Sequence, residues 1–417
     1  MGMTIAEKIL SSHCKSETRA GDIVIAEIDH MMAQDGTAPL AIRAFHQMGG
    51  VSVARPERII FCIDHNAPSP AMSISQLHAN MRSFAKEQGI EITDIGEGVC
   101  HQIVVEKGYA RPGNLVIGAD SHTCTYGALN SFACGVGSTD LASAMLTGKL
   151  WFRVPESARV VVKGKTGRGV FAKDIALALV GKVTADGATY LALEITGETI
   201  EALEIDGRLT ISNMVVEMGA KAGIMLADKK IISYLEGRAK GEWKPVEPDP
   251  RASYVDEIEL DVSKLSPQVA MPHSPDNVFP IEEVEGKTIS QGLIGTCTNG
   301  RLEDLRVAAS LLSGRKLKEG VRLIIAPASR NIMLHALKEG LVEIFLEAGC
   351  VVVNPGCASC VGTHQGIPGD GENVISTANR NFKGRMGNPN SFIYLASPAT
   401  VAASCIEGRI TDPRKYI

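Results

Sequence analysis

Short apolar runs alternate with amphipathic stretches along residues 1–160. Apolar residues at helical spacing predict helices at 5–11, 39–48, 75–88 and 138–147. Continuous apolar runs predict strands at 23–28, 58–63, 90–95 and 115–117. Helices that alternate with strands are typical of an α/β layer structure with a mainly parallel sheet, so we expect this architecture in the first part of the chain.

The same alternation continues in the remaining sequence. A strand-like run at 159–163 precedes a helical pattern at 173–180, and a third α/β pattern begins at 288. Residues 246–287 are rich in proline and acidic residues and predict a linker. A chain of 417 residues is too long for one ordinary domain. We therefore predict three α/β domains, at 1–157, 158–286 (with the linker) and 287–417.

Composition and charge exclude several classes of protein. Hydrophobic residues make up 45% of the chain and the formal net charge is −5, so no overall positive charge attracts nucleic acid or an anionic membrane. The N-terminus lacks the pattern of a signal peptide, and no run reaches the roughly 18 apolar residues of a membrane span. Ten scattered cysteines do not resemble a secreted disulfide framework. We expect a soluble, cytoplasmic protein that binds neither nucleic acid nor membranes.

Three cysteines follow apolar runs in the third unit. Cys297 comes after the run at 288–294, and Cys357 and Cys360 come after the run at 350–353. Loops at strand ends are where open α/β sheets place their sites. Three thiolates suit an iron–sulfur cluster with one iron not held by protein. Structural zinc is the alternative, because His364 would complete a Cys3His set, and spacing alone leaves both open.

Histidines recur near the ends of predicted strands in the first unit, and two of the three groups also contain an acidic residue. The pairs and triplets are Asp64-His65, His101-Gln102 and Asp120-Ser121-His122. A single pair of this kind is more often structural than catalytic, but three such groups lie between residues 64 and 122. A carboxylate bonded to one imidazole nitrogen fixes the tautomer and raises the basicity of the ring. These groups are therefore candidates to hold and transfer protons near neutral pH.

Two polar motifs occur later in the chain. Asn213 and Glu217 are four residues apart in a predicted helix at 212–219, so they would share one face. An exposed polar stripe is the commoner explanation of such a pair. Arg380 and Arg385 lie in a short basic segment. A solvated loop explains this segment, but guanidinium groups are also the preferred partners of carboxylates.

Taken in order, these motifs resemble the aconitase superfamily. The shared motifs are Asp64-His65, His101-Gln102, Asp120-Ser121-His122, Asn213 with Glu217, Gly-Thr-Cys-Thr-Asn at 295–299, the Cys-x-x-Cys loop at 357–360 and Asn-Arg-Asn-Phe-x-Gly-Arg at 379–385. In length the chain resembles the branch of 3-isopropylmalate dehydratase and homoaconitase large subunits. In that branch, the mobile fourth domain of aconitase is a separate small protein.

The resemblance implies three α/β/α domains around a cluster cleft, without the swivelling fourth domain. It implies one [4Fe-4S] cluster per chain on Cys297, Cys357 and Cys360, with one iron left for substrate. The implied function is that of a hydro-lyase acting on a small hydroxy di- or tricarboxylic acid. The first candidate substrate is 3-isopropylmalate, and the alternatives are the large subunits of homoaconitase or of a dimethylmalate-type dehydratase. The implied catalytic residues are Asp64, His65, His101, Asp120, Ser121, His122 and Glu217. The implied substrate-binding residues are Gln34, Asn213, Arg380 and Arg385.

The resemblance also implies a partner chain. In the family, a serine on the swivelling domain removes the carbon-bound proton, and no stretch of this sequence resembles that domain. We therefore expect activity only with a small subunit, in a heterodimer or heterotetramer. Two other classes compete with this interpretation. An electron-transfer iron–sulfur protein would want a fourth protein ligand, and a zinc-stabilised structural protein would contain no sulfide.

Overall fold

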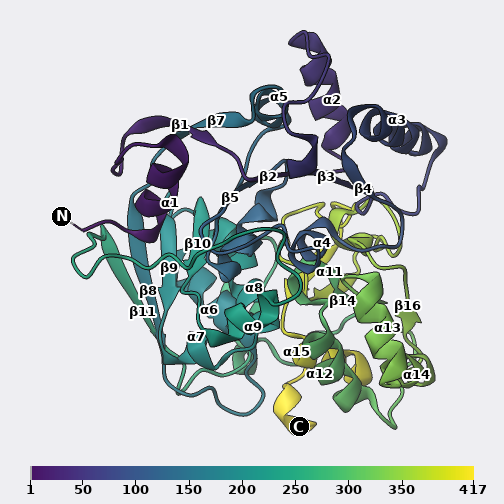
Figure 1. Cartoon of the computed structure of the whole chain (residues 1–417). Helices are drawn as coiled ribbons and strands as arrows, with labels where there is room; N and C mark the ends of the chain where they lie inside the picture. Colours follow the sequence, from purple (N-terminus) through teal and green to yellow (C-terminus); the bar gives the residue numbers. More distant parts are fainter. Residues whose placement is uncertain (1) are drawn as a thin grey trace.

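The computed structural model describes residues 2–417 and contains four β-sheets with helices packed around them (Figure 1). The first part of the chain forms a parallel five-stranded sheet of order β4-β3-β2-β5-β6. Its strands are β2 His30–Gln34, β3 Ile59–Cys62, β4 Glu91–Thr93, β5 Leu115–Gly118 and β6 Phe132–Gly135. An antiparallel ribbon joins β1 Ile23–Glu27 to β7 Lys149–Arg153. The helices are α1 Ile5–Cys14, α2 Ala38–Gln47, α3 Met72–Gln88, α4 Cys100–Glu106 and α5 Ser138–Thr147.

The second part forms a parallel four-stranded sheet of order β10-β9-β8-β11. Its strands are β8 Ser157–Lys163, β9 Ala192–Thr196, β10 Ala222–Met225 and β11 Asp256–Asp261. Its helices are α6 Ala172–Val183, α7 Glu198–Ala202, α8 Ile205–Met214 and α9 Lys229–Leu235. This part is drawn in teal in Figure 1.

The third part forms a seven-stranded sheet of order β13-β12-β18-β17-β14-β15-β16. Its strands are β12 Gln268–Ala270, β13 Val278–Pro280, β14 Gln291–Gly295, β15 Arg322–Ala326, β16 Val351–Val352, β17 Asn373–Ser376 and β18 Phe392–Leu395. Its helices are α10 Ile281–Val284, α11 Thr296–Asn299, α12 Leu302–Leu312, α13 Arg330–Lys338, α14 Leu341–Ala348 and α15 Pro398–Glu407. The strands from β14 to β18 are parallel to one another, and β12 and β13 are antiparallel.

Strand order reverses within both of the larger sheets. In the first sheet the reversal lies between β2 and β5, where Gln34 ends one strand and Asp120 follows the other. In the third sheet it lies between β14 and β17, where Cys297 and Asn379 follow the two strands. Ligands of open α/β sheets bind beyond the carboxyl ends of strands at such reversals. The fold therefore places sequence-predicted site residues at two positions suited to ligands.

The α/β architecture with parallel sheets is confirmed, and most predicted elements exist with shifted ends. For example, the helix predicted at 75–88 does end at Gln88, because Gly89 takes the left-handed conformation that closes α3. The three domains at 1–157, 158–286 and 287–417 remain a proposal. The sheets support it broadly, although β12 and β13 precede residue 287 and pair into the third sheet.

Two predictions about local structure were wrong. The predicted linker at 246–287 contains strands: β11 completes the second sheet and β12 extends the third. The predicted helix at 212–219 is also interrupted. α8 ends at Met214 and a 3-10 turn follows over Val215–Met218, so Asn213 and Glu217 do not lie on one α-helical face. Among residues 2–417, no helix is both long enough and apolar enough to span a bilayer.

Candidate active site

The strand ends at the two reversals lie around one cavity. Its volume is about 120 Å³, and a single water needs only roughly 10–15 Å³, so a group larger than a water fits. The lining residues are Gln34, His65, Val99, His101, Asp120, His122, Cys297, Cys357, Cys360, Val361, Asn379, Arg380 and Arg385. The structure thus brings together histidines of the first part of the chain with cysteines and arginines of the third.

The remaining predicted residues lie around this cavity. Asp64, Asn213 and Glu217 are buried and contact residues that line it. Ser121 is exposed beside Asp120 and lines a separate surface groove instead. All predicted residues except Ser121 therefore belong to the cavity or to its immediate support.

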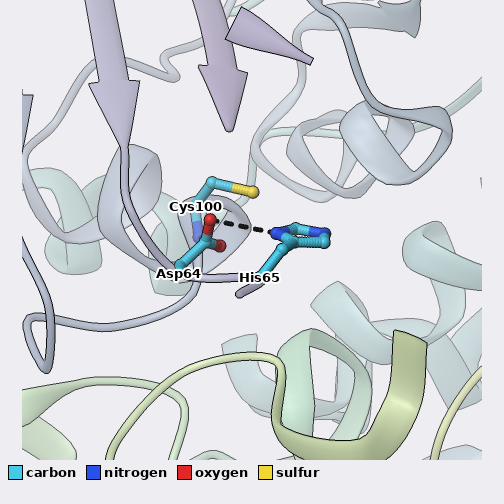
Figure 2. A group of neighbouring side chains, drawn as sticks. All are labelled: Asp64, His65 and Cys100. Carbon is cyan, nitrogen blue, oxygen red and sulfur yellow. Dashed lines mark hydrogen bonds and ion pairs between the residues drawn. The ribbon is translucent and has the colours of Figure 1, made fainter. Parts of the chain in front are cut away.

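Asp64 and His65 form a buried pair at the end of β3 (Figure 2). Asp64 Oδ1 lies 3.0 Å from His65 Nδ1, and Asp64 Oδ2 accepts a hydrogen bond of 2.7 Å from the backbone N–H of Cys100. On the other side of the ring, His65 Nε2 lies 3.5 Å from Asp120 Oδ2. Burial lowers the pKa of His65, but the neighbouring charges of Asp64 and Asp120 outweigh burial and raise this pKa well above its usual range. His65 is therefore held as an imidazolium.

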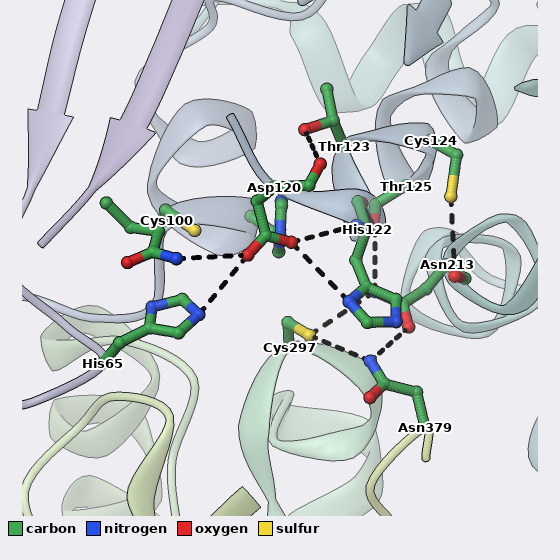
Figure 3. A network of polar contacts seen from close by, with 12 residues as sticks. His65, Cys100, Asp120, His122, Thr123, Cys124, Thr125, Asn213, Cys297 and Asn379 are labelled. Carbon is green, nitrogen blue, oxygen red and sulfur yellow. Dashed lines mark hydrogen bonds and ion pairs between the residues drawn. The ribbon is translucent and has the colours of Figure 1, made fainter. Parts of the chain in front are cut away.

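Asp120 is the centre of the hydrogen-bond network in Figure 3. Its Oδ1 lies 2.8 Å from His101 Nε2 and accepts a bond of 2.9 Å from the backbone N–H of His122. Gln34 Nε2 donates to its Oδ2 at 3.5 Å. Burial raises the pKa of Asp120, but its contacts with His101 and the other histidines outweigh burial and hold this pKa well below 3.8. A permanent negative charge therefore stands among three imidazole rings.

His101 behaves differently from His65 although both contact the same carboxylate. Its ring is fully enclosed, and burial lowers its pKa below 6.5 despite the charge of Asp120. His101 Nδ1 lies 3.2 Å from the hydroxyl of Tyr126, which can donate to it. Nε2–H of a neutral ring then donates to Asp120. The site thus holds one charged and one neutral imidazole on opposite sides of Asp120.

Glu217 connects the second and third parts of the chain to His122. Its Oε1 lies 2.8 Å from His122 Nε2, and Arg380 Nε donates to both carboxylate oxygens at 2.9 and 3.1 Å. Burial raises the pKa of Glu217, but His122 and Arg380 outweigh burial and lower it. The hydrogen-bonded series His122–Glu217–Arg380 therefore links all three parts of the molecule.

The cysteine sulfurs have N–H donors directed at them. The amides of Asn213 and Asn379 each lie 3.5 Å from Cys297 Sγ, and Figure 3 shows both approaching the sulfur. Arg385 Nη2 lies 3.7 Å from Cys360 Sγ. Hydrogen bonds to sulfur are one of the features by which proteins tune iron–sulfur clusters. These donors suit thiolates better than neutral thiols, because a thiolate is the stronger acceptor.

The backbone beside the cysteines is unusual. Gly295 has φ +150°, and a Cβ there would lie 2.2 Å from the carbonyl oxygen of Ala326. Thr296, directly before Cys297, has φ 70°, and Ala358, directly after Cys357, has φ 48°. Non-glycine residues in the left-handed region are uncommon and concentrate at functional sites. Both cysteine loops are therefore held in conformations that the surrounding structure imposes.

The donor set fits a cluster better than the zinc site considered from the sequence. His364 does not line the cavity, and its Nε2 lies 2.8 Å from the backbone carbonyl of His65, which accepts its hydrogen bond. The Cys3His arrangement is therefore not assembled. Three cysteines line the cavity, amide and guanidinium donors approach two of their sulfurs, and this set matches the thiolate ligation of an iron–sulfur cluster.

Two supporting residues were missed by the sequence analysis. Asp35 Oδ1 accepts from the backbone N–H groups of Asp64 and His65 at 3.0 and 2.7 Å, so it fixes the loop that carries the pair. Its position directly after Gln34 was the available signal. Arg301 is fully buried and donates to the backbone carbonyls of Cys297 and Thr298 at 2.7 and 2.8 Å. No sequence pattern distinguishes Arg301 from an ordinary surface arginine.

Comparison of the sequence with known proteins identifies a family. The sequence profile of the Aconitase family (aconitate hydratase) matches residues 7–288 and 282–408. The 3-isopropylmalate dehydratase large subunit 2 of Archaeoglobus fulgidus is 56% identical over 100% of both chains. The 3-isopropylmalate dehydratase large subunit 1 of Methanopyrus kandleri is 51% identical over 100% of both chains. The probable methanogen homoaconitase large subunit of Methanosarcina mazei is 52% identical over 94% of this chain and 100% of its own. The chain belongs to the aconitase family.

Proposed function

We propose that this chain is the large subunit of a hydro-lyase that interconverts isomers of a hydroxy acid by dehydration and rehydration, with 3-isopropylmalate as the first candidate substrate. The observation that carries the proposal is the cavity that joins three cysteine sulfurs to the charged His65. The relatives named 3-isopropylmalate dehydratase large subunit support the choice of substrate. The relative named homoaconitase large subunit supports a homologous acid as the alternative.

Cys297, Cys357 and Cys360 are the proposed ligands of one [4Fe-4S] cluster per chain, in which one iron has no protein ligand. When bound, the cluster supplies a Lewis acid that polarises the substrate hydroxyl. Asn213 and Asn379 donate hydrogen bonds to the sulfur of Cys297, and Arg385 donates one to the sulfur of Cys360. These donors favour the thiolate form of the ligands.

His65 is the proposed proton donor to the departing hydroxyl. Asp64 holds Nδ1 at 3.0 Å, so the proton on Nε2 is the one that faces the cavity. Asp120 stands 3.5 Å from Nε2 and keeps this proton in place until substrate arrives. A positioned general acid contributes about 10²–10⁴-fold to the rate.

Arg380 and Arg385 are the proposed partners of substrate carboxylates. Arg380 uses Nε for Glu217, so its two terminal nitrogens remain for a carboxylate at the cavity. Such bidentate pairing gives both affinity and orientation. Gln34 lines the cavity and stays a candidate for substrate binding. Ser121 is exposed and lines a separate groove, so its candidacy rests on the family resemblance alone.

The base that removes the carbon-bound proton is proposed to lie on a small subunit that carries the swivelling domain. The names of the relatives as large subunits support such a partner. The assembly would be a heterodimer or heterotetramer.

The test begins with the chain purified without oxygen. Iron and acid-labile sulfide are measured, and electron paramagnetic resonance is recorded before and after mild oxidation. We expect iron and sulfide in the ratio of a cluster, and a three-iron signal that disappears when ferrous iron is restored. Zinc without sulfide would overturn the proposal.

Activity is then measured with 3-isopropylmalate and with homocitrate, each with and without an added small subunit. We expect turnover only with the small subunit. Cys360→Ala should abolish both the cluster and turnover, whereas Cys14→Ala, at a half-buried cysteine away from the cavity, should change neither.

A further inference from the structure

Lys173 is a fully buried cation that the proposed reaction does not use. It lies at the start of α6 with 0% of its surface exposed. Its Nζ donates to the backbone carbonyls of Thr377 and Ala378 at 2.8 and 2.7 Å. The neighbouring carboxylate of Asp174 is engaged elsewhere, by the backbone N–H groups of Phe171 and Gln268 at 2.8 Å each. The hydrogen-bond partners of this ammonium group are therefore main-chain carbonyls.

The segment that Lys173 holds is the one that reaches the cysteine sulfur. Asn379 follows the two held carbonyls and donates to Cys297 Sγ at 3.5 Å. Thr377 Oγ1 accepts a bond of 3.0 Å from the backbone N–H of Gly295, two residues before Cys297. Lys173 thus supports Cys297 by two routes, one through the side chain of Asn379 and one through the backbone before the cysteine.

A buried ammonium group is unfavourable unless negative charge lies nearby. Burial lowers the pKa of Lys173 to about 7, and negative charge on Cys297 and Cys360 is the largest influence that opposes this shift. Cysteines that ligate a metal are deprotonated, so a loaded site is rich in negative charge. Deprotonated cysteines in a loaded site therefore provide the negative charge that stabilises the buried ammonium group of Lys173.

We propose that Lys173 is a positioning residue for the iron–sulfur cluster: it fixes the segment 377–379, whose Asn379 donates to Cys297, and it places one buried positive charge in the support of the cluster site. This inference rests on the proposed function, because it requires the cluster at Cys297, Cys357 and Cys360. It has a consequence that packing alone does not have. Reduction adds negative charge to the cluster, so a fixed cation stabilises the reduced form and raises the reduction potential.

The test compares four variants of the full chain, purified without oxygen and loaded with iron and sulfide. Lys173→Met removes the charge and the hydrogen bonds, Lys173→Gln removes the charge but keeps an N–H donor, and Lys173→Arg keeps the charge. Lys182→Met is the matched control, because Lys182 is an exposed lysine on the same helix. The midpoint potential of the cluster is measured by redox titration followed by electron paramagnetic resonance.

We expect Lys173→Met and Lys173→Gln to shift the reduction equilibrium toward the oxidised form by about tenfold, which is about 59 mV for one electron. Lys173→Arg should restore most of this shift, and Lys182→Met should leave the potential unchanged. If Lys173→Met does not fold, the glutamine variant still decides the question. A wild-type potential in Lys173→Gln would overturn the inference. A wild-type chain without iron and sulfide would instead overturn the proposed function, and this inference with it.

Discussion

At the scale of single residues, the chemistry of the site depends on how one carboxylate is shared. Asp120 contacts both His65 and His101, yet the pKa of His65 is raised and that of His101 is lowered. The difference is that His65 has a second carboxylate, Asp64, whereas His101 has the neutral hydroxyl of Tyr126. Groups whose environments push their pKa values apart mark the assignment of acid and base. This contrast supports the proposal that His65, and not His101, is the proton donor.

Replacing Asp64 tests this assignment through pH. His65 acts as an acid only below its pKa, so the turnover of the assembled enzyme should fall as pH rises through that pKa. Asp64→Asn removes one of the two charges that raise it, so the fall should begin at a lower pH. The measurement is kcat against pH at saturating substrate. Asp29→Asn, which removes the partner of the distant His13, should leave the profile unchanged, and an unshifted profile for Asp64→Asn would contradict the assignment.

Replacing His65 tests its weight in catalysis. His65→Gln keeps a polar side chain but cannot donate a proton as a cation. We expect kcat to fall by about 10²–10⁴-fold, because a positioned general acid is lost. Iron content should stay at the wild-type level, because His65 is not one of the proposed cluster ligands. Loss of the cluster in this variant would mean that His65 supports the metal site and not the proton transfer.

At the scale of elements, the site is made where strands end and backbone leaves its common conformations. Cys297 follows β14 through Gly295 and Thr296, both at positive φ. A side chain at Gly295 has no room, because a Cβ would meet the carbonyl of Ala326 at 2.2 Å. The direction of Cys297 toward the cavity therefore depends on a glycine two residues earlier.

Gly295→Ala should consequently damage the cluster site. The backbone conformation of Gly295, which is essentially open to glycine only, costs about 1–3 kcal/mol for a residue with a Cβ, and the contact with Ala326 adds to this. We expect a lower thermal midpoint and a lower iron content per chain. Gly314→Ala is the control, since Gly314 also has positive φ, at 69°, but no atom lies within 4 Å of its Cβ position. Gly314→Ala should lose some stability and keep its iron; equal iron loss in both variants would contradict the argument.

The sequence predicted most elements but not the ones that depend on tertiary contacts. Apolar runs and apolar residues at helical spacing located α3, α5 and the strands β3 and β5, because these signals are local. The break between Asn213 and Glu217 was missed, since both residues follow a helical pattern. The 3-10 turn directs Glu217 to His122 and Arg380, which are distant in sequence. The strands in 246–287 were missed because proline and acidic residues at the surface resemble a linker.

The candidate site was more predictable than its support. The predicted cysteines, histidines and arginines come together because each follows a strand end, and parallel strands end at the same edge of a sheet. Lys173 and Arg301 carry no such signal, because their roles consist of contacts with backbone carbonyls of other segments. A pattern along the chain does not record which main-chain group a buried cation will meet.

At the scale of the whole molecule, the site exists only where three parts of the chain meet. His122 belongs to the first part, Glu217 to the second and Arg380 to the third, and their contacts of 2.8 and 2.9 Å form one continuous line. The three parts are therefore joined by charge as well as by packing at the point where catalysis is proposed. Changes in Glu217 should accordingly affect the stability of the whole chain and not only the site.

Glu217→Gln provides the test, with a pH dependence whose sign follows from the structure. The pKa of Glu217 is lowered in the folded chain, so its contribution to stability is present above its unfolded pKa and disappears as pH falls through its folded pKa. At pH 7 we expect the glutamine variant to lose about 1–3 kcal/mol of unfolding free energy, because a buried, paired charge is removed. The loss should shrink as pH falls through the folded pKa of Glu217, which lies below its usual value, because the wild-type carboxyl then also becomes neutral. Urea unfolding at several pH values measures both effects.

Glu339→Gln is the control: it breaks the exposed pair with Arg306 and should leave stability nearly unchanged. A loss in Glu217→Gln that stayed constant with pH would show that shape, and not the charge that links the three parts, supports the site.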